Sequence, residues 1–245
     1  MPEPFFPLNI IDHISHAAAI ADREIRADLI LGYIANENDY SSNLTASIRR
    51  IINGFHFPGL SATSYVLQDS VERKVGCDVA IILENASALK VCLFEAKFPR
   101  FKTHKNYWDS IQKSTGNSHF HEQILKQSNW SSVFSIWEMI YCEYPYKQQP
   151  SYYPDFFSSC IWHEDAYQAA ITRPNPKIEW NDTELQQLMQ KNGLTIDEMI
   201  KITCSCKSGM KLPKEKYHQM FIDYGVPSEV LVINYAETVR ESFFG

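Results

Sequence analysis

Two neighbouring apolar segments carry charged residues that a buried strand rarely contains. The segments read VGCDVAIIL at residues 75–83 and LKVCLFEAKF at residues 89–98, with a short polar turn between them. This pattern predicts a β-hairpin, and segments that are apolar on both faces are typical of strands covered by helices on both sides. An ionised side chain in such a strand costs free energy unless it is paired or holds a metal ion. Asp78, Glu95 and Lys97 therefore point to a functional site in this hairpin.

The chain is long enough and apolar enough to fold around a large core. It has 245 residues, of which 44% are hydrophobic and 13% are aromatic, and this composition excludes global disorder. The formal net charge of −6 argues against a uniformly basic surface for nucleic acid. A local basic channel beside an acidic site remains compatible with that charge.

Cysteine usage and hydropathy indicate a reducing compartment. The six cysteines are scattered, and because only Cys204 and Cys206 lie close together, no second pair completes a zinc site. The N-terminus lacks a basic segment followed by an apolar one, so no signal peptide is expected. No apolar run approaches the ~18 residues of a membrane span. We therefore expect a soluble, cytoplasmic protein without a membrane partner.

Hydrophobic periodicity outlines the other secondary-structure elements. Apolar residues at helical spacing predict helices over residues 12–34, 40–52, 118–127, 183–191 and 214–224, and a capping box at residues 195–198 opens one more. Strands are predicted at residues 63–68, 156–162 and 230–234, residues 133–144 fit either a helix or a strand, and residues 99–113 are expected to be irregular.

The order of these elements predicts an α/β fold with a central mixed β-sheet flanked by helices. We expect this core to occupy residues 1–175, including the N-terminal helices. A soft boundary near Pro174 and Pro176 separates it from a mainly helical extension over residues 176–245, packed on the core. The extension contains no residues that indicate a particular chemistry.

The charged residues of the hairpin are of the types that form a metal site. Glu95 and Lys97 point to the same face, because side chains two residues apart in a strand do so. Asp78 can approach Glu95 across the hairpin if the register allows it. Two carboxylates on one face form a hard-oxygen site suited to Mg²⁺ or Mn²⁺. Such an ion can activate water and neutralise a phosphate group, and a nearby lysine can stabilise the same negative charge.

Asp78 on one strand and the triplet Glu95-Ala96-Lys97 on the next resemble the motif of the PD-(D/E)XK nuclease superfamily. Cys77 stands where the family pattern has a proline. The resemblance covers roughly residues 36–127, about two fifths of the chain. It implies a restriction-endonuclease-like core and a metal-dependent nuclease activity.

The resemblance also implies roles for individual residues of the motif. Asp78 and Glu95 would ligate Mg²⁺ (or Mn²⁺), with the Ala96 carbonyl as a candidate third ligand. Lys97 would orient or activate the attacking water.

Two further positions follow from the resemblance, each with an alternative. The family places an acidic residue on a helix before the hairpin, and Glu37 or Asp39 can supply it, with Glu37 slightly favoured. Some branches of the family use a glutamine on the helix after the triplet, and Gln123 and Gln127 occupy that region.

A bare Glu-X-Lys triplet carries little information, because about one is expected by chance in a chain of this length. Indeed Glu72-Arg73-Lys74 is a second copy, and its three consecutive charges indicate a solvated turn. The copy at Glu95 differs because it lies in a buried apolar segment with Asp78 on the partner strand. The structural alternative is an ion pair between Glu95 and Lys97 without a function. Three histidines do not have the spacing of paired metal ligands and are expected at the surface: His119, His121 and His163.

Basic residues follow the hairpin and alternate with aromatic ones, a pattern that suits a groove for a nucleic-acid backbone. Arg100, Lys102 and Lys105 are the candidate contacts, and Arg49 on an earlier helix could add one. The alternatives are an ordinary solvated loop and an ordinary exposed helix face.

Together these features predict a Mg²⁺-dependent endonuclease, a hydrolase of DNA phosphodiester bonds. RNA is a further candidate substrate, because hydrolysis of the backbone does not itself select the sugar. The alternative is a catalytically inactive subunit of the same fold that binds nucleic acid or a protein partner. A homodimer or a larger complex, and a role in restriction or anti-phage defence, are suggested by the resemblance alone.

Overall fold

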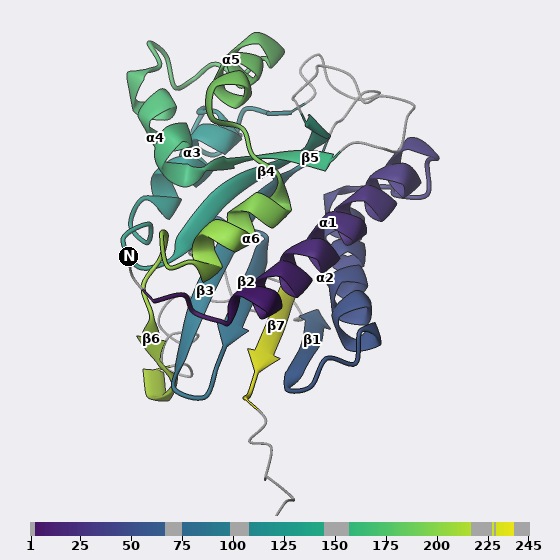
Figure 1. Ribbon diagram of the computed structural model, residues 1–245. Coiled ribbons are helices and arrows are strands. Elements are labelled where there is room, and N and C mark those ends of the chain that lie inside the picture. The colour runs from purple at the N-terminus through teal and green to yellow at the C-terminus, as the bar shows by residue number, and fades with distance from the viewer. Residues whose placement is uncertain are drawn as a thin grey trace, which may run out of the picture.

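The chain folds into a mixed seven-stranded sheet flanked by helices, which confirms the predicted α/β class. The computed structural model describes residues 3–66, 75–98, 108–144, 157–216, 227 and 229–237. The strands are β1 (Leu60–Val66), β2 (Val79–Glu84), β3 (Ala88–Lys97), β4 (Ser135–Tyr144), β5 (Phe157–Trp162), β6 (Leu212–Pro213) and β7 (Glu229–Tyr235). They follow the order β1-β7-β2-β3-β4-β5 across the sheet, and β6 pairs with β3 outside this path (Figure 1).

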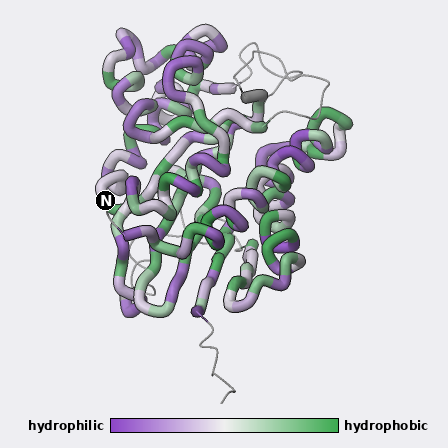
Figure 2. The backbone as a smooth tube through the Cα atoms, in the orientation of Figure 1, coloured by the Kyte–Doolittle hydropathy of each residue, from purple (hydrophilic) through white to green (hydrophobic). Residues whose placement is uncertain are grey.

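Six α-helices lie in the described residues. They are α1 (Leu8–Ile30), α2 (Glu37–Gly54), α3 (His119–Gln127), α4 (His163–Thr172), α5 (Asp182–Asn192) and α6 (Ile196–Cys204), and a 3₁₀ turn, η1, spans Lys214–Lys216. Figure 2 shows hydrophobic and hydrophilic positions interleaved along these helices, as amphipathic helices require. None of the described helices combines the length and the apolar character that crossing a membrane would need.

The predicted hairpin is present, and it is buried on both faces. β2 and β3 pair antiparallel, with Val79 opposite Phe94 and Glu84 opposite Leu89. The side-chain amide oxygen of Asn85 accepts hydrogen bonds from the backbone N–H groups of Ser87 (3.0 Å) and Ala88 (2.9 Å), which closes the turn. The apolar runs that predicted these strands are therefore explained by their place inside the sheet.

Different helices cover the two faces of the sheet. Ile81 and Phe94 pack in one cluster with residues of α1, α2 and α6, such as Ile14. Ile140 and Ile161 belong to another cluster with residues of α3, α4 and α5. Because neighbouring residues of a strand point to opposite faces, α3 lies on the face of β3 that carries Glu95 and Lys97.

The structure differs from several of the predicted helix and strand boundaries, and it settles the one segment that fitted either a helix or a strand. Residues 133–144, which fitted a helix or a strand, form β4 from Ser135. The first two helices begin earlier than predicted, and α2 now includes Glu37. Helix α4 was not predicted, because β5 runs directly into it and Trp162 at the N-cap makes no side-chain capping bond. Of the helix predicted at 214–224, the described part is the 3₁₀ turn η1, and the remainder lies outside the described residues.

The C-terminal region contributes to the sheet itself. β7 lies between β1, to which it is antiparallel, and β2, to which it is parallel. A mainly helical extension is therefore an incomplete description of residues 176–245. The strand at 230–234 was predicted from its apolar residues, but its partners come from strands more than a hundred residues away, which local patterns do not reveal.

Candidate active site

Three carboxylates meet at one end of the hairpin. Glu37, Asp78 and Glu95 each offer an oxygen, and these three oxygens lie within 4.8 Å of one another. Asp78 precedes β2 and Glu95 is near the end of β3, and antiparallel pairing brings these ends together, with the Asp78 N–H donating to the Phe94 carbonyl at 2.9 Å. Glu37 joins them from the first turn of α2. We call these three residues the acidic cluster.

The main chain fixes the carboxylate of Asp78. Its Oδ2 accepts a hydrogen bond from the Ala96 N–H at 3.0 Å. Two residues earlier, Gly76 has a positive φ of 74°, and a Cβ there would lie 3.2 Å from the Gln123 carbonyl oxygen. Glycine therefore allows both the turn into Asp78 and the close approach of α3. Cys77, at the position of the expected proline, is a buried thiol whose pKa is raised well above its usual value, chiefly by burial.

The structure distinguishes the two candidate helix acids. Asp39 is turned toward the start of its own helix, where Oδ2 accepts from the Ala35 N–H at 3.2 Å and from Asn36 Nδ2 at 3.1 Å. Glu37 Oε2 instead accepts from the Phe98 N–H, at 3.2 Å, just after β3. Glu37 is therefore the acid that lies in the cluster, and Asp39 stabilises the α2 N-terminus.

Lys97 and Gln123 complete the site. The Lys97 ammonium group is paired with Glu95 Oε1 and donates to Gln123 Oε1 at 2.9 Å. The Gln123 amide also donates to Glu95 Oε1. The other oxygen, Glu95 Oε2, is buried and has no hydrogen-bond partner among the residues that the structure describes. Gln123 and Glu37 are both partly exposed, so the site reaches the molecular surface.

Burial and charge shift the pKa values of the site in a consistent direction. Burial raises the pKa of the Glu95 carboxyl well above its usual range, and the neighbouring charge of Asp78 adds to this. Burial alone would lower the pKa of Lys97, but Glu95, Glu37 and Asp78 outweigh it and raise that pKa. Lys97 is therefore a cation at neutral pH, and the carboxylates of the cluster outnumber it.

Of the four predicted nucleic-acid contacts, Arg49 is the one that lies in the described residues, and it is remote from the cluster along its helix. Arg49 lies twelve residues after Glu37 on the same helix, which separates them by about 18 Å along its axis. The other three predicted contacts, Arg100, Lys102 and Lys105, lie outside the described residues.

Sequence reasoning missed a second set of polar residues beside the cluster. Glu138 on β4 is the register partner of Glu95 on β3 and is completely buried. His163 and His121, expected at the surface, are buried, with 2% and 7% exposure. Glu138 carried the same signal as Glu95, a charge within an apolar run, but residues 133–144 could not be assigned to a strand.

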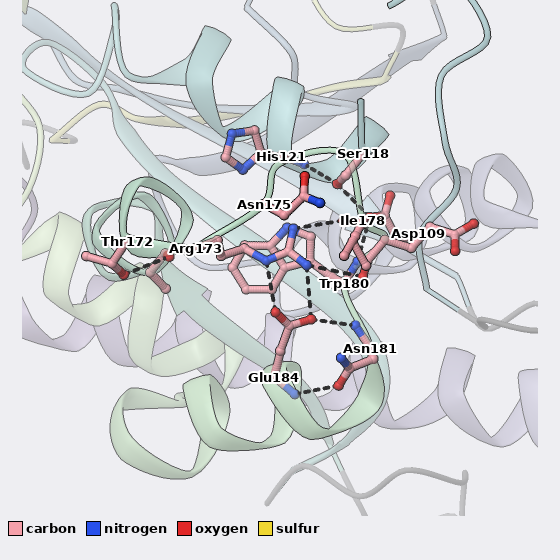
Figure 3. Close-up of polar contacts among 12 residues, drawn as sticks. Asp109, Ser118, His121, Thr172, Arg173, Asn175, Ile178, Trp180, Asn181 and Glu184 are labelled. Carbon is pink, nitrogen blue, oxygen red and sulfur yellow. Dashed lines mark hydrogen bonds and ion pairs between the residues drawn. The ribbon is translucent and has the colours of Figure 1, made fainter. Parts of the chain in front are cut away.

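A third polar group anchors the start of α3 (Figure 3). Asp109 Oδ2 accepts from Ser118 Oγ at 2.6 Å and from the Trp180 N–H at 2.9 Å. Nearby, Arg173 donates to both carboxylate oxygens of Glu184, at 2.9 and 3.1 Å. The Arg173–Glu184 pair balances its own charge, unlike the acidic cluster, and we interpret it as structural.

The candidate active site combines three converging carboxylates with a protonated lysine. One of its buried carboxylate oxygens, Glu95 Oε2, has no hydrogen-bond partner among the described residues. Carboxylate oxygens are the ligands that Mg²⁺ and Mn²⁺ prefer, so the donor set is suited to such an ion. None of the protein-family models, curated proteins or solved structures compared with this chain matches it.

Proposed function

We propose that this protein is a divalent-metal-dependent nuclease that hydrolyses phosphodiester bonds of DNA. The observation that carries the proposal is the acidic cluster beside Lys97, in which Glu95 Oε2 is buried without a hydrogen-bond partner among the described residues. The resemblance of Asp78 and the triplet Glu95-Ala96-Lys97 to the PD-(D/E)XK motif supports the choice of substrate.

The residues present fit a hard divalent cation. A buried carboxylate oxygen without a donor is unfavourable, and coordination by a cation would satisfy it. Glu37, Asp78 and Glu95 would hold Mg²⁺ or Mn²⁺ between them. When bound, the ion would supply charge stabilisation to the phosphate and lower the pKa of a water molecule.

Lys97 and Gln123 have roles that follow from their own chemistry. Because its pKa is raised, Lys97 stays protonated and is a poor base at neutral pH. It is suited instead to donate hydrogen bonds to a phosphate oxygen or to the attacking water. Gln123 donates to Glu95 and accepts from Lys97, so it fixes the orientation of both side chains.

DNA cleavage tests the proposal directly. Purified protein with Mg²⁺ or Mn²⁺ should cut supercoiled plasmid and linear DNA, and Asp78→Asn should lower the rate at least about 100-fold, the usual effect of losing a group that stabilises charge in the transition state. RNA of the same sequence is the parallel substrate. Cleavage of RNA alone would contradict the assignment to DNA, and Mn²⁺ binding without any cleavage would favour an inactive subunit.

Glu37 and Asp39 form a matched pair for the helix acid. Glu37→Gln should lower both cleavage and Mn²⁺ affinity by about 10-fold or more, because it removes a carboxylate from the cluster. Asp39→Asn should leave both within about 2-fold, because that side chain stabilises its own helix end. The reverse order of effects would contradict the position that we assign to Glu37.

A further inference from the structure

The residue that lies one helical turn after Gln123 faces a second buried carboxylate. Gln127 follows Gln123 by four residues on α3, so both amides lie on one face of the helix. Gln123 contacts Glu95 on β3, and Gln127 contacts Glu138 on β4. Because Glu95 and Glu138 are register partners on adjacent parallel strands, two glutamine–glutamate pairs lie side by side under α3.

Gln127 is the centre of a fully buried network. Its Nε2 donates to the Gly76 carbonyl at 2.8 Å and to Glu138 Oε2 at 3.3 Å. Its Oε1 lies 2.8 Å from His163 Nδ1, which is also 3.4 Å from Glu138 Oε1. Since the amide nitrogen faces the Gly76 carbonyl, the amide oxygen must accept from His163, and Nδ1 is the nitrogen that carries the proton.

This network adjoins three segments that carry residues of the candidate active site: the Asp78 turn, β3 and α3. Gly76 lies two residues before Asp78, Glu138 is beside Glu95 in the sheet, and Gln127 is on the same helix as Gln123. A shift of Gln127 would therefore move the Asp78 turn and the Gln123 amide together. A buried glutamate and histidine cost free energy in a core that apolar residues could fill, which a role in positioning would explain.

We propose that Gln127, Glu138 and His163 are positioning residues for the acidic cluster, with the His163 Nδ1–H group setting the orientation of the Gln127 amide. The inference rests on the proposed function. Substitutions of hydrogen-bonding groups behind metal ligands typically change metal affinity or activity by about 10- to 100-fold, and we expect an effect of that size.

Two isosteric substitutions of His163 test the inference. The amide of asparagine places a donor where Nδ1 was, whereas that of glutamine places it near Nε2. His163→Asn should therefore keep kcat for DNA cleavage and Mn²⁺ affinity within about 3-fold of the wild type. His163→Gln should lower kcat or Mn²⁺ affinity about 10-fold or more, with KM for DNA unchanged. Glu184→Ala is the control, because it removes a structural ion pair with Arg173 and the capping box of α5, in which the cluster residues take no part.

The outcomes separate this inference from the proposed function. If the wild type neither binds Mn²⁺ nor cuts DNA, the proposed function fails and the inference falls with it. If the wild type is active and His163→Gln matches it, or if both variants lose activity equally, the positioning role is wrong and the proposed function stands. If Glu184→Ala lowers kcat as much as His163→Gln does, the effect reflects stability and the inference is overturned.

Discussion

Lys90 and Lys97 lie on the same strand, β3, and both are buried, yet their surroundings differ. They are an odd number of residues apart, so they point to opposite faces of the sheet. Lys90 donates to the carbonyl oxygens of Ser208 (2.7 Å) and Gly209 (2.8 Å), beyond the end of α6. Lys97 is paired with Glu95 and belongs to the acidic cluster.

The partners, and not the strand, decide in which direction the pKa of each lysine shifts. Burial lowers the pKa of Lys90, and the nearby thiols only partly oppose this. Burial also acts on Lys97, but three carboxylates reverse it and raise the pKa. Neutral carbonyl groups hold a lysine in a structural position, whereas an excess of carboxylates creates a charged site. The comparison shows how a structural and a candidate functional lysine can be told apart within one strand.

The largest difference should appear in DNA cleavage. Lys97→Met should lower the rate of Mg²⁺-dependent cleavage at least about 100-fold, because the ammonium group that stabilises phosphate charge is lost. Lys90→Met should change the rate by less than about 2-fold in folded protein, since its partners are on the other face. Equal losses in both variants, with folding verified by circular dichroism, would show that the two lysines do not differ in function.

The loss of stability should also be larger for Lys97→Met than for Lys90→Met, but the two variants should differ less in stability than in DNA cleavage. Lys97→Met leaves buried carboxylates without their cation and should lower the free energy of unfolding by about 3–5 kcal/mol at pH 7 without metal. Lys90→Met leaves two carbonyl groups without a donor and should cost about 1–3 kcal/mol. Urea titration measures both values. A larger loss for Lys90→Met would mean that its carbonyl contacts outweigh the ion pair.

The two lysines should also give opposite pH dependence. The folded pKa of Lys97 lies above the ordinary 10.5, so its contribution to stability is complete below that pH and is lost as the pH rises further. The folded pKa of Lys90 lies below 10.5, so its contribution increases with pH between the folded value and 10.5. The difference in unfolding free energy between the wild type and each methionine variant, measured from pH 8 to 11, should show these two trends. If the two stability differences followed the same trend with pH, the opposite pKa shifts assigned to Lys97 and Lys90 would be wrong.

The smallest effect concerns Glu95 in the absence of metal. Its folded pKa is raised above 4.5, so ionisation costs stability as the pH rises through that value. Glu95→Gln should therefore raise the free energy of unfolding at pH 7, and this gain should disappear as the pH falls below 4.5. Added Mn²⁺ should stabilise the wild type and not the variant. If Mn²⁺ stabilises both equally, Glu95 is not a ligand.

The hairpin could be predicted because its information is local. Charges inside an apolar run identify Asp78, Glu95 and Lys97 without any knowledge of the fold. The choice between Glu37 and Asp39 could not be made in the same way. It depends on Asn36 being the N-cap of α2, and the predicted helix began three residues after Glu37.

The parts that were missed depend on contacts between distant segments. Glu138 becomes informative only when β4 is known to pair with β3. The burial of His163 follows from a strand that continues directly into a helix without a capping signal. The place of β7 between β1 and β2 is set by pairing across most of the chain, to which hydrophobic periodicity is insensitive.

The central position of β7 has a consequence for the order of assembly during synthesis. β7 is made after every other strand of the sheet, yet it joins β1 to β2 and receives a hydrogen bond from α2, where Ser42 Oγ donates to Glu229 Oε1 at 2.5 Å. Helix α2 carries Glu37, whereas Asp78 and Glu95 belong to the hairpin. Until residue 235 has left the ribosome, β7 cannot pair with β1 and β2. Until then α2 also lacks its hydrogen bond from Ser42 to Glu229 of β7. The nascent chain therefore gains this tie between α2 and the sheet only after β7 has been made.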